Sequence, residues 1–199
     1  AKDTKGGGDN GQSPDEIPDY AQIVLTYISA NPTTGTVYPN HETFSFEHAN
    51  GVVLEIMEAV PGTVNKVLPI PTAEDGFAFD YWTDGTNKEF VKSPQMFTIG
   101  YSADTTFTAY FDADEKGGGE DGKDPDGTPD KYQTFFYYAS AGNGTVEGKL
   151  FEKYENVGGA KPEASPKAEV TVKADTGYAF DYWTDNDGTK YWTLDQIRA

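Results

Sequence analysis

The chain has 199 residues, no cysteine and a formal net charge of −18. A strong negative charge repels the phosphates of nucleic acids and of anionic lipids, and the absence of cysteine excludes disulfide bonds and thiol chemistry. Because of this charge we expect no nucleic-acid partner. No apolar run approaches the roughly 18 residues of a membrane-spanning helix, so we also expect no membrane insertion.

The composition favours strands over helices. There are 13 Tyr and 12 Phe but five Leu, and aromatic side chains fit the pleated surface of a sheet. Residues 52–59 suit either a short helix or a strand. After an acidic, Gly-rich segment, we predict strands at residues 22–29, 36–46, 66–70, 77–82, 97–99 and 105–111.

A nine-residue block occurs twice in the chain. Residues 76–84 read GFAFDYWTD, and residues 177–185 read GYAFDYWTD. The similarity includes the preceding segments, because residues 6–22 and 117–133 share a Gly-rich run, two Pro-Asp pairs and a final Gln at an offset of 111 residues. We therefore interpret the chain as a tandem repeat, each copy having an acidic leader and a β-rich body.

The repeat predicts the domain organisation. We expect a mainly β fold of the β-grasp-like or mixed-sheet type, in small modules joined by an acidic Gly/Pro-rich linker. The predicted parts are a leader at 1–19, a first module at 20–112, a linker at 113–131 and a second module at 132–199.

The second copy ends after its Trp block, without counterparts of residues 97–99 and 105–111. Two explanations are open. Either the chain is a piece of a longer protein, or another chain supplies the last strand, because an open sheet edge is a template for strand pairing and self-association by strand exchange.

Short motifs carry a family resemblance. Residues 69–82, PIPTAEDGFAFDYW, and residues 177–183, GYAFDYW, resemble the Listeria–Bacteroides repeat, also called the internalin B-repeat-like module. Residues 124–133, DPDGTPDKYQ, resemble the Asp-rich spacer that precedes such modules in surface proteins of Gram-positive bacteria. Tyr81 and Tyr182 depart from the family, which usually has Gly there. The resemblance implies β-grasp-like modules of secreted or wall-anchored proteins, including adhesins.

The second leader contains a candidate calcium loop. Asp124, Asp126 and Asp130 take the third, fifth and ninth positions of a D-x-D-x-D-G-x-x-D pattern, in which Gly127 makes the sharp turn. The first position is not acidic, and in the first leader Glu16 replaces the Gly. Ca²⁺ is thus the one candidate cofactor, and the alternative interpretation is an acidic flexible linker.

Aromatic residues are the candidate ligand-binding groups. Tyr81, Trp82, Tyr182, Trp183 and Trp192 have amphipathic rings suited to a glycan or a host protein. The alternative is structural, because a module with few Leu has to build its core from aromatic rings.

A strand at residues 77–82 would place alternate side chains on opposite faces of the sheet. It places Phe77, Phe79 and Tyr81 on one face, and Asp80 and Trp82 on the other. The Trp face would then be partly hydrated.

Catalysis has little support in the sequence. The two His, His41 and His48, both lie in the first copy, and their spacing of seven does not suit a zinc pair. The Gly-rich runs lie in the leaders and not between a strand and a helix, so they do not form a phosphate loop. We expect no enzyme.

These observations predict a non-catalytic repeat region of an extracellular protein of the bacterial cell surface or cell wall, acting as a spacer or stalk and in adhesion. The expected partner is a host or matrix glycoprotein or glycan. One alternative is a glycan- or host-protein-binding module that uses exposed aromatics. Another is a polymer subunit whose second module is completed by a neighbouring strand.

Overall fold

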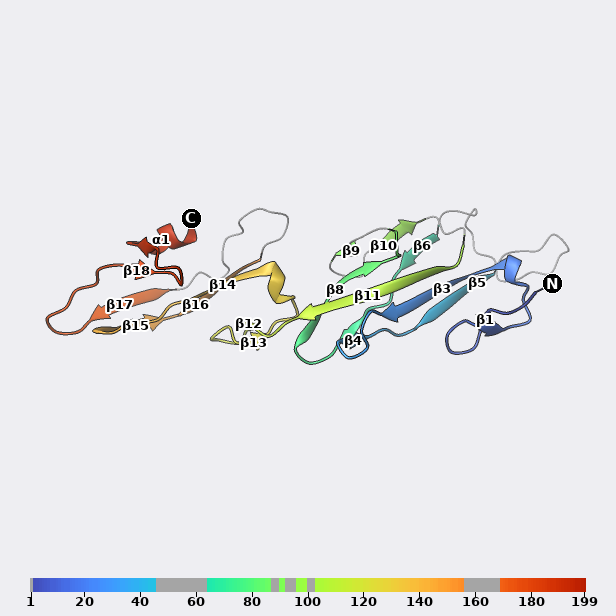
Figure 1. The fold of residues 1–199 in the computed structure, drawn as a ribbon, viewed down its shortest axis with the longest axis horizontal. Coiled ribbons are helices and arrows are strands. Elements are labelled where there is room, and N and C mark those ends of the chain that lie inside the picture. Colours follow the sequence, from blue (N-terminus) through green and yellow to red (C-terminus); the bar gives the residue numbers. More distant parts are fainter. Residues whose placement is uncertain (1, 46–63, 87–89, 92–95, 100–102, 156–168) are drawn as a thin grey trace. The chain divides into compact units, whose positions relative to one another are not determined.

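The computed structural model describes residues 2–45, 64–86, 90–91, 96–99, 103–155 and 169–199, which are mainly β. They form two compact units (Figure 1): Ala1–Gly117 with Asp124–Lys131, and Gly118–Lys123 with Tyr132–Ala199. The predicted linker is thus divided between the units. The predicted helix or strand at 52–59 and the candidate His48 lie outside the described residues.

The first unit is built on a five-stranded sheet with the order β5-β3-β11-β8-β9. Its strands are β3 (Gln22–Ser29), β5 (His41–Ser45), β8 (Phe77–Thr83), β9 (Phe90–Val91) and β11 (Thr105–Ala113). The central strands β3 and β11 are parallel, and all other neighbours are antiparallel. Smaller antiparallel pairs join β4 (Gly35–Thr36) to β7 (Thr72–Ala73) and β6 (Val64–Val67) to β10 (Met96–Ile99).

The first four residues of strand β3, Gln22 to Leu25, are buried on both faces of the sheet, whereas Ile28 near its end is exposed. One face contributes Ile23, Leu25 and Tyr27 to the core, where they pack with residues from the neighbouring strands. The other members of this core are Leu68, Trp82, Phe107 and Ala109, with Val37, Phe79 and Phe111 against them.

Strand β8 contains a β-bulge, so its side chains do not alternate between the two faces as predicted. The pairing with β11 runs from Tyr110 opposite Tyr81 to Phe111 opposite Phe79, so Asp80 has no directly opposed residue. A bulge adds one residue and changes which side chains share a face. Phe79 and Trp82 therefore meet, with ring centroids 6.0 Å apart, and the prediction of a separate, partly hydrated Trp face is wrong.

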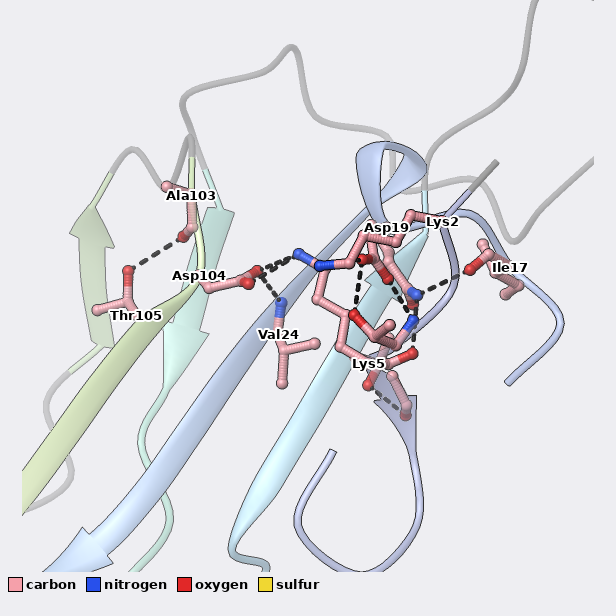
Figure 2. A network of polar contacts seen from close by, with 12 residues as sticks. Lys2, Lys5, Ile17, Asp19, Val24, Ala103, Asp104 and Thr105 are labelled. Carbon is pink, nitrogen blue, oxygen red and sulfur yellow. Dashed lines mark hydrogen bonds and ion pairs between the residues drawn. The ribbon is translucent and has the colours of Figure 1, made fainter. Parts of the chain in front are cut away.

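The first leader is folded onto this sheet. It contains β1 (Gly6–Gly7), paired with β2 (Ser13–Pro14), and the 3-10 helix η1 (Asp19–Ala21). Figure 2 shows Asp104, just before β11, accepting hydrogen bonds from Lys5 Nζ at 2.7 Å and from the backbone N–H of Val24 at 2.9 Å. Gly11 lies so close to Val24 that a Cβ there would be 2.8 Å from the Val24 side chain. The leader thus covers the second face of β3.

The second unit has shorter strands and smaller sheets. Pairs join β14 (Gln133–Tyr137) to β16 (Phe151–Glu155), β15 (Gly144–Gly148) to β17 (Val170–Ala174) and β18 (Trp183–Thr184) to β19 (Lys190–Tyr191). Helix α1 (Leu194–Arg198) follows β19. The second leader contains β12 (Gly117–Gly118), paired with β13 (Asp124–Pro125), and the 3-10 helix η2 (Asp130–Tyr132). Within the described residues no helix has the length and apolarity needed to cross a bilayer.

Candidate functional site

In the first unit the repeated block belongs to the core. Trp82 is 2% exposed and meets Tyr27 edge-on, with ring centroids 6.1 Å apart. Its indole ring is therefore not accessible to a glycan. Tyr81 is half-buried and stacks on Tyr110 at 4.7 Å.

In the second unit the same block makes the same aromatic contacts. Trp183 lies edge-on to Tyr138 at 5.6 Å and 72°, as Trp82 does to Tyr27 at 6.1 Å and 70°. It also lies 5.4 Å from Phe180, at the 56° angle found between Trp82 and Phe79. Trp183 is nevertheless only half-buried.

Strand β11 explains why Trp82 is more deeply buried than Trp183. In the first unit Phe107 of β11 stacks on Tyr27 at 5.8 Å, and Phe111 meets Phe79 at 6.0 Å. Strand β11 lies between β3 and β8, and among the described residues of the second unit no strand lies in the corresponding place. Phe180 is accordingly 44% exposed and Tyr178 60% exposed.

A groove of about 510 Å³ marks this place in the second unit. It lies between β14 and the β18–β19 hairpin, the counterparts of β3 and the β8–β9 pair. Its walls include Phe136, Tyr138, Trp183, Tyr191 and Ile197. The groove opens to solvent, and its lining combines these aromatic and aliphatic side chains with the polar Thr184, Asp185, Asn186 and Asp187.

The second unit contains a buried polar cluster. Tyr138 donates a hydrogen bond to the buried carboxylate of Glu152, and Arg198 Nε of α1 donates to the same oxygen at 2.9 Å. Burial, together with the bond to Glu152, raises the pKa of Tyr138, and the bond to Glu152 raises that of Arg198. Tyr27 and Glu42 make the corresponding pair in the first unit.

The remaining aromatic candidates lie near the groove. Tyr182 is half-buried, and the ammonium of Lys190 lies 4.0 Å from its ring centroid. Trp192 is 59% exposed, and its backbone N–H donates to Gln196 Oε1 at 2.7 Å. Of the five candidate rings, Trp192 is the one presented most fully to solvent.

The three candidate calcium ligands are not gathered around one point. Asp126 Oδ1 accepts from the N–H of Thr128 at 3.0 Å. Asp130 accepts from the N–H of Glu115 at 3.4 Å and lies 3.8 Å from Lys116 Nζ, while Asp124 is exposed in β13. In the described part of the chain, no group of three or more acidic or His side chains is arranged to hold a metal ion.

Two residues that attach the second leader to the first unit, Asp114 and Lys131, are not identified by the sequence analysis. The buried Asp114 accepts from the N–H groups of Asp126 and Gly127, at 3.0 and 2.7 Å. Lys131 reaches back to Asp80 of β8 at 2.5 Å and Asp112 of β11 at 2.8 Å. The alignment of the two leaders could have identified Asp114, because Asp3 lies 111 residues before it. It could not have identified Lys131, because the residue at the same offset is Tyr20.

The contact between Lys131 and Asp112 shifts the pKa of both groups. Desolvation opposes the charge on Lys131, but its hydrogen bonds to Asp112 and Asp80 prevail and raise its pKa. The hydrogen bond from Lys131 lowers the pKa of Asp112. The contact is therefore an ion pair across the neutral pH range.

The sequence matches no family model, and comparisons with curated proteins and with solved structures gave no significant match.

Proposed function

We propose that the chain is a non-catalytic region of repeated β modules from an extracellular protein of the bacterial cell surface, acting as a spacer or stalk and in adhesion. The two compact units are two copies of one β-grasp-like module, and the described residues of the second contain no counterpart of strand β11. The repeated block, the shared aromatic contacts and the motifs that resemble Listeria–Bacteroides repeats support this proposal.

The observation that carries the proposal is the attachment of the second leader to the preceding module. Lys131 bonds to β8 and β11 through Asp80 and Asp112, and Asp114, directly after β11, holds the N–H groups of Asp126 and Gly127. These contacts fold an acidic segment that composition alone assigns to a flexible linker. A spacer benefits from such contacts, because a folded leader resists extension and proteolysis.

Single-molecule pulling tests the spacer role. We expect the first unit and residues 124–131 to unfold together, releasing a length of about 130 residues at ~3.6 Å each. In Lys131→Met we expect the leader to extend first, at lower force. Extension of the leader before the module in the unaltered chain, or unfolding without a measurable force, contradicts a spacer that resists force.

A second candidate function is favoured by Trp192. Its exposed ring can bind a glycan or a host protein, because an indole gives a large apolar contact with a polar N–H. The test is binding to an array of glycans and matrix glycoproteins, with Trp192→Ala compared with Tyr38→Ala, a control whose ring is exposed in the first unit. Loss of binding in Trp192→Ala alone supports this function, and equal binding by both variants excludes it.

A further inference from the structure

A polar pocket lies in the first unit, where the first leader meets the sheet. Its volume is about 340 Å³, near the lower end of the range for small-molecule sites, about 300–1,000 Å³. The leader, strand β3 and the start of β11 supply its walls, which include Lys5, Gln12, Val24, Thr26, Asp104 and Thr106. Segments far apart in the sequence therefore build one pocket of the size of a small ligand.

The two charged groups of the pocket are paired with each other. Lys5 Nζ lies 2.7 Å from both carboxylate oxygens of Asp104, and the backbone N–H of Val24 donates to Asp104 Oδ1 at 2.9 Å (Figure 2). The side chains of Lys5 and Asp104 are still 22% and 48% exposed. Because an ammonium has three donors and a carboxylate about four acceptor sites, both groups keep hydrogen-bonding capacity for a ligand.

This pairing decides which ligand charge suits the pocket. The lining contains no other charged side chain, so its formal charges cancel. A small anion would meet the carboxylate of Asp104, and a small cation would meet the ammonium of Lys5. The pocket therefore suits a neutral ligand that donates and accepts hydrogen bonds.

Two threonine hydroxyls add to this capacity. Thr26 of β3 and Thr106 of β11 are register partners in the parallel pair, so their side chains lie on one face of the sheet. Among the described residues, neither hydroxyl and no side-chain atom of Gln12 has a hydrogen-bond partner. A hydroxyl and an amide each offer both a donor and an acceptor.

We propose that this pocket binds one sugar unit of a neutral glycan, whose hydroxyl groups form hydrogen bonds with Lys5, Asp104 and Thr106. A sugar hydroxyl both donates and accepts, as this mixed lining requires. Neighbouring hydroxyls of one ring match the adjacent carboxylate and ammonium. Since the Val24 N–H and Lys5 already fix the Asp104 carboxylate, little of the binding free energy is lost in ordering it.

The inference gives the proposed adhesion a site and a ligand class, and it rests on that part of the proposed function. It places the glycan on the first unit, whereas Trp192 lies on the second. Binding of the chain to a glycan array that does not involve this pocket would leave adhesion standing and overturn the pocket. The pulling experiment tests the spacer role separately.

Nuclear magnetic resonance of the ¹⁵N-labelled 199-residue chain detects sugar binding residue by residue. The probes are the free monosaccharides glucose, galactose, mannose and N-acetylglucosamine. With at least one of them we expect saturable shifts of the amide signals at residues 5, 12, 24–26 and 104–106. The Kd should be millimolar, because one sugar has few non-hydrogen atoms. No saturable shift with any of these probes, or shifts confined to the second unit, overturns the proposal.

Thr106→Val tests the hydroxyl and keeps the β-branched shape of the side chain. We expect it to bind the sugar about three- to tenfold more weakly, because one hydrogen bond is lost. Thr108→Val, on the same face of β11 but outside the pocket lining, is the matched control and should bind as the unaltered chain does. Equal sugar affinities of the two variants contradict the pocket as the site.

Glucuronic acid tests the preference for a neutral ligand. Its ring resembles that of glucose but has a carboxylate, which the carboxylate of Asp104 repels. We expect it to bind more weakly than the neutral sugar that binds best, in the same titration. Binding as tight as that of the neutral sugar, or tighter, would show that Lys5 forms an anion site and would overturn the proposal.

Discussion

At the scale of single residues, the two leaders differ at one strained position. Glu16 adopts φ 73°, and Gly127, its counterpart, adopts φ 83°. The N–H of Glu16 bonds to Asp3 at 2.8 Å, and that of Gly127 bonds to Asp114 at 2.7 Å, so the same turn is built in both. A side chain is costly in this left-handed conformation, whereas Gly adopts it without strain.

Exchanging these residues should change stability in opposite directions. We expect Glu16→Gly to stabilise the first unit by up to about 1 kcal/mol and Gly127→Ala to destabilise it by about 1–2 kcal/mol. A Cβ at Gly127 meets no atom within 4 Å, so its cost is that of the backbone alone. Urea denaturation measures both changes. A stabilising Gly127→Ala contradicts the assigned turn.

The ion pairs of Lys131 predict a pH dependence. The pKa of Asp112 is lowered in the folded state. The contribution of Asp112 to stability is therefore fully present above its pKa in the unfolded chain, about 3.9, and is lost as the pH falls further. The pKa of Lys131 is raised in the folded state. The contribution of Lys131 to stability is therefore present below the pKa of an unfolded lysine, about 10.4, and is lost at higher pH. The stabilisation therefore spans the neutral range.

We expect Lys131→Met to lower the free energy of unfolding by about 1–3 kcal/mol at pH 7, because it removes hydrogen bonds to two carboxylates. The difference from the unaltered chain should shrink below pH 4. Lys123→Met, which removes a pair between exposed side chains, is the control and should leave stability unchanged. A constant difference from pH 7 to pH 2 would show that the effect is not electrostatic.

At the scale of elements, two nine-residue sequences that differ at one residue, Phe77 against Tyr178, have different structures. The alternation of the first copy predicted a strand, which is confirmed for β8, but the faces were assigned wrongly because the bulge at Asp80 depends on pairing with β11. In the second unit most of the block is not a strand. Strand propensity is a local preference, and a neighbouring strand decides whether it is realised.

The two Trp of the block should differ in their contribution to stability. Trp82→Ala should destabilise the first unit by about 3–5 kcal/mol, because it leaves a large cavity in a closed core. Trp183→Ala should cost less than about 2 kcal/mol, because its site is open to solvent. Denaturation followed by hydrogen exchange assigns each loss to its unit. Equal losses would indicate that the second unit is as fully packed as the first.

At the scale of the whole molecule, the net charge of −18 makes calcium the obvious ligand to test. Asp126 and Asp130 already accept hydrogen bonds from backbone N–H groups, so a bound ion would have to displace them. We therefore expect the melting temperature to be the same in millimolar CaCl₂ and in EDTA. A rise in calcium that Asp126→Asn abolishes would instead establish the loop at Asp124, Asp126 and Asp130 as a calcium site.

Sequence alone determined the mainly β character and most strands of the first unit, because residue periodicity is a local property. Burial of Trp82 was also favoured, since a chain with five Leu builds its core from aromatic rings. The contacts of Lys131 with Asp80 and of Arg198 with Glu152 were not predictable, because each joins residues far apart in a chain rich in carboxylates.

Tertiary structure alone decided what the repeated block does. Strand β11 enters the sheet between β3 and β8 and completes the core of the first unit. In the described second unit no strand takes that place, so the same aromatic residues surround an open groove. The physical reason is that a strand needs hydrogen-bonded neighbours and a covered apolar face, and neither is encoded in its own residues.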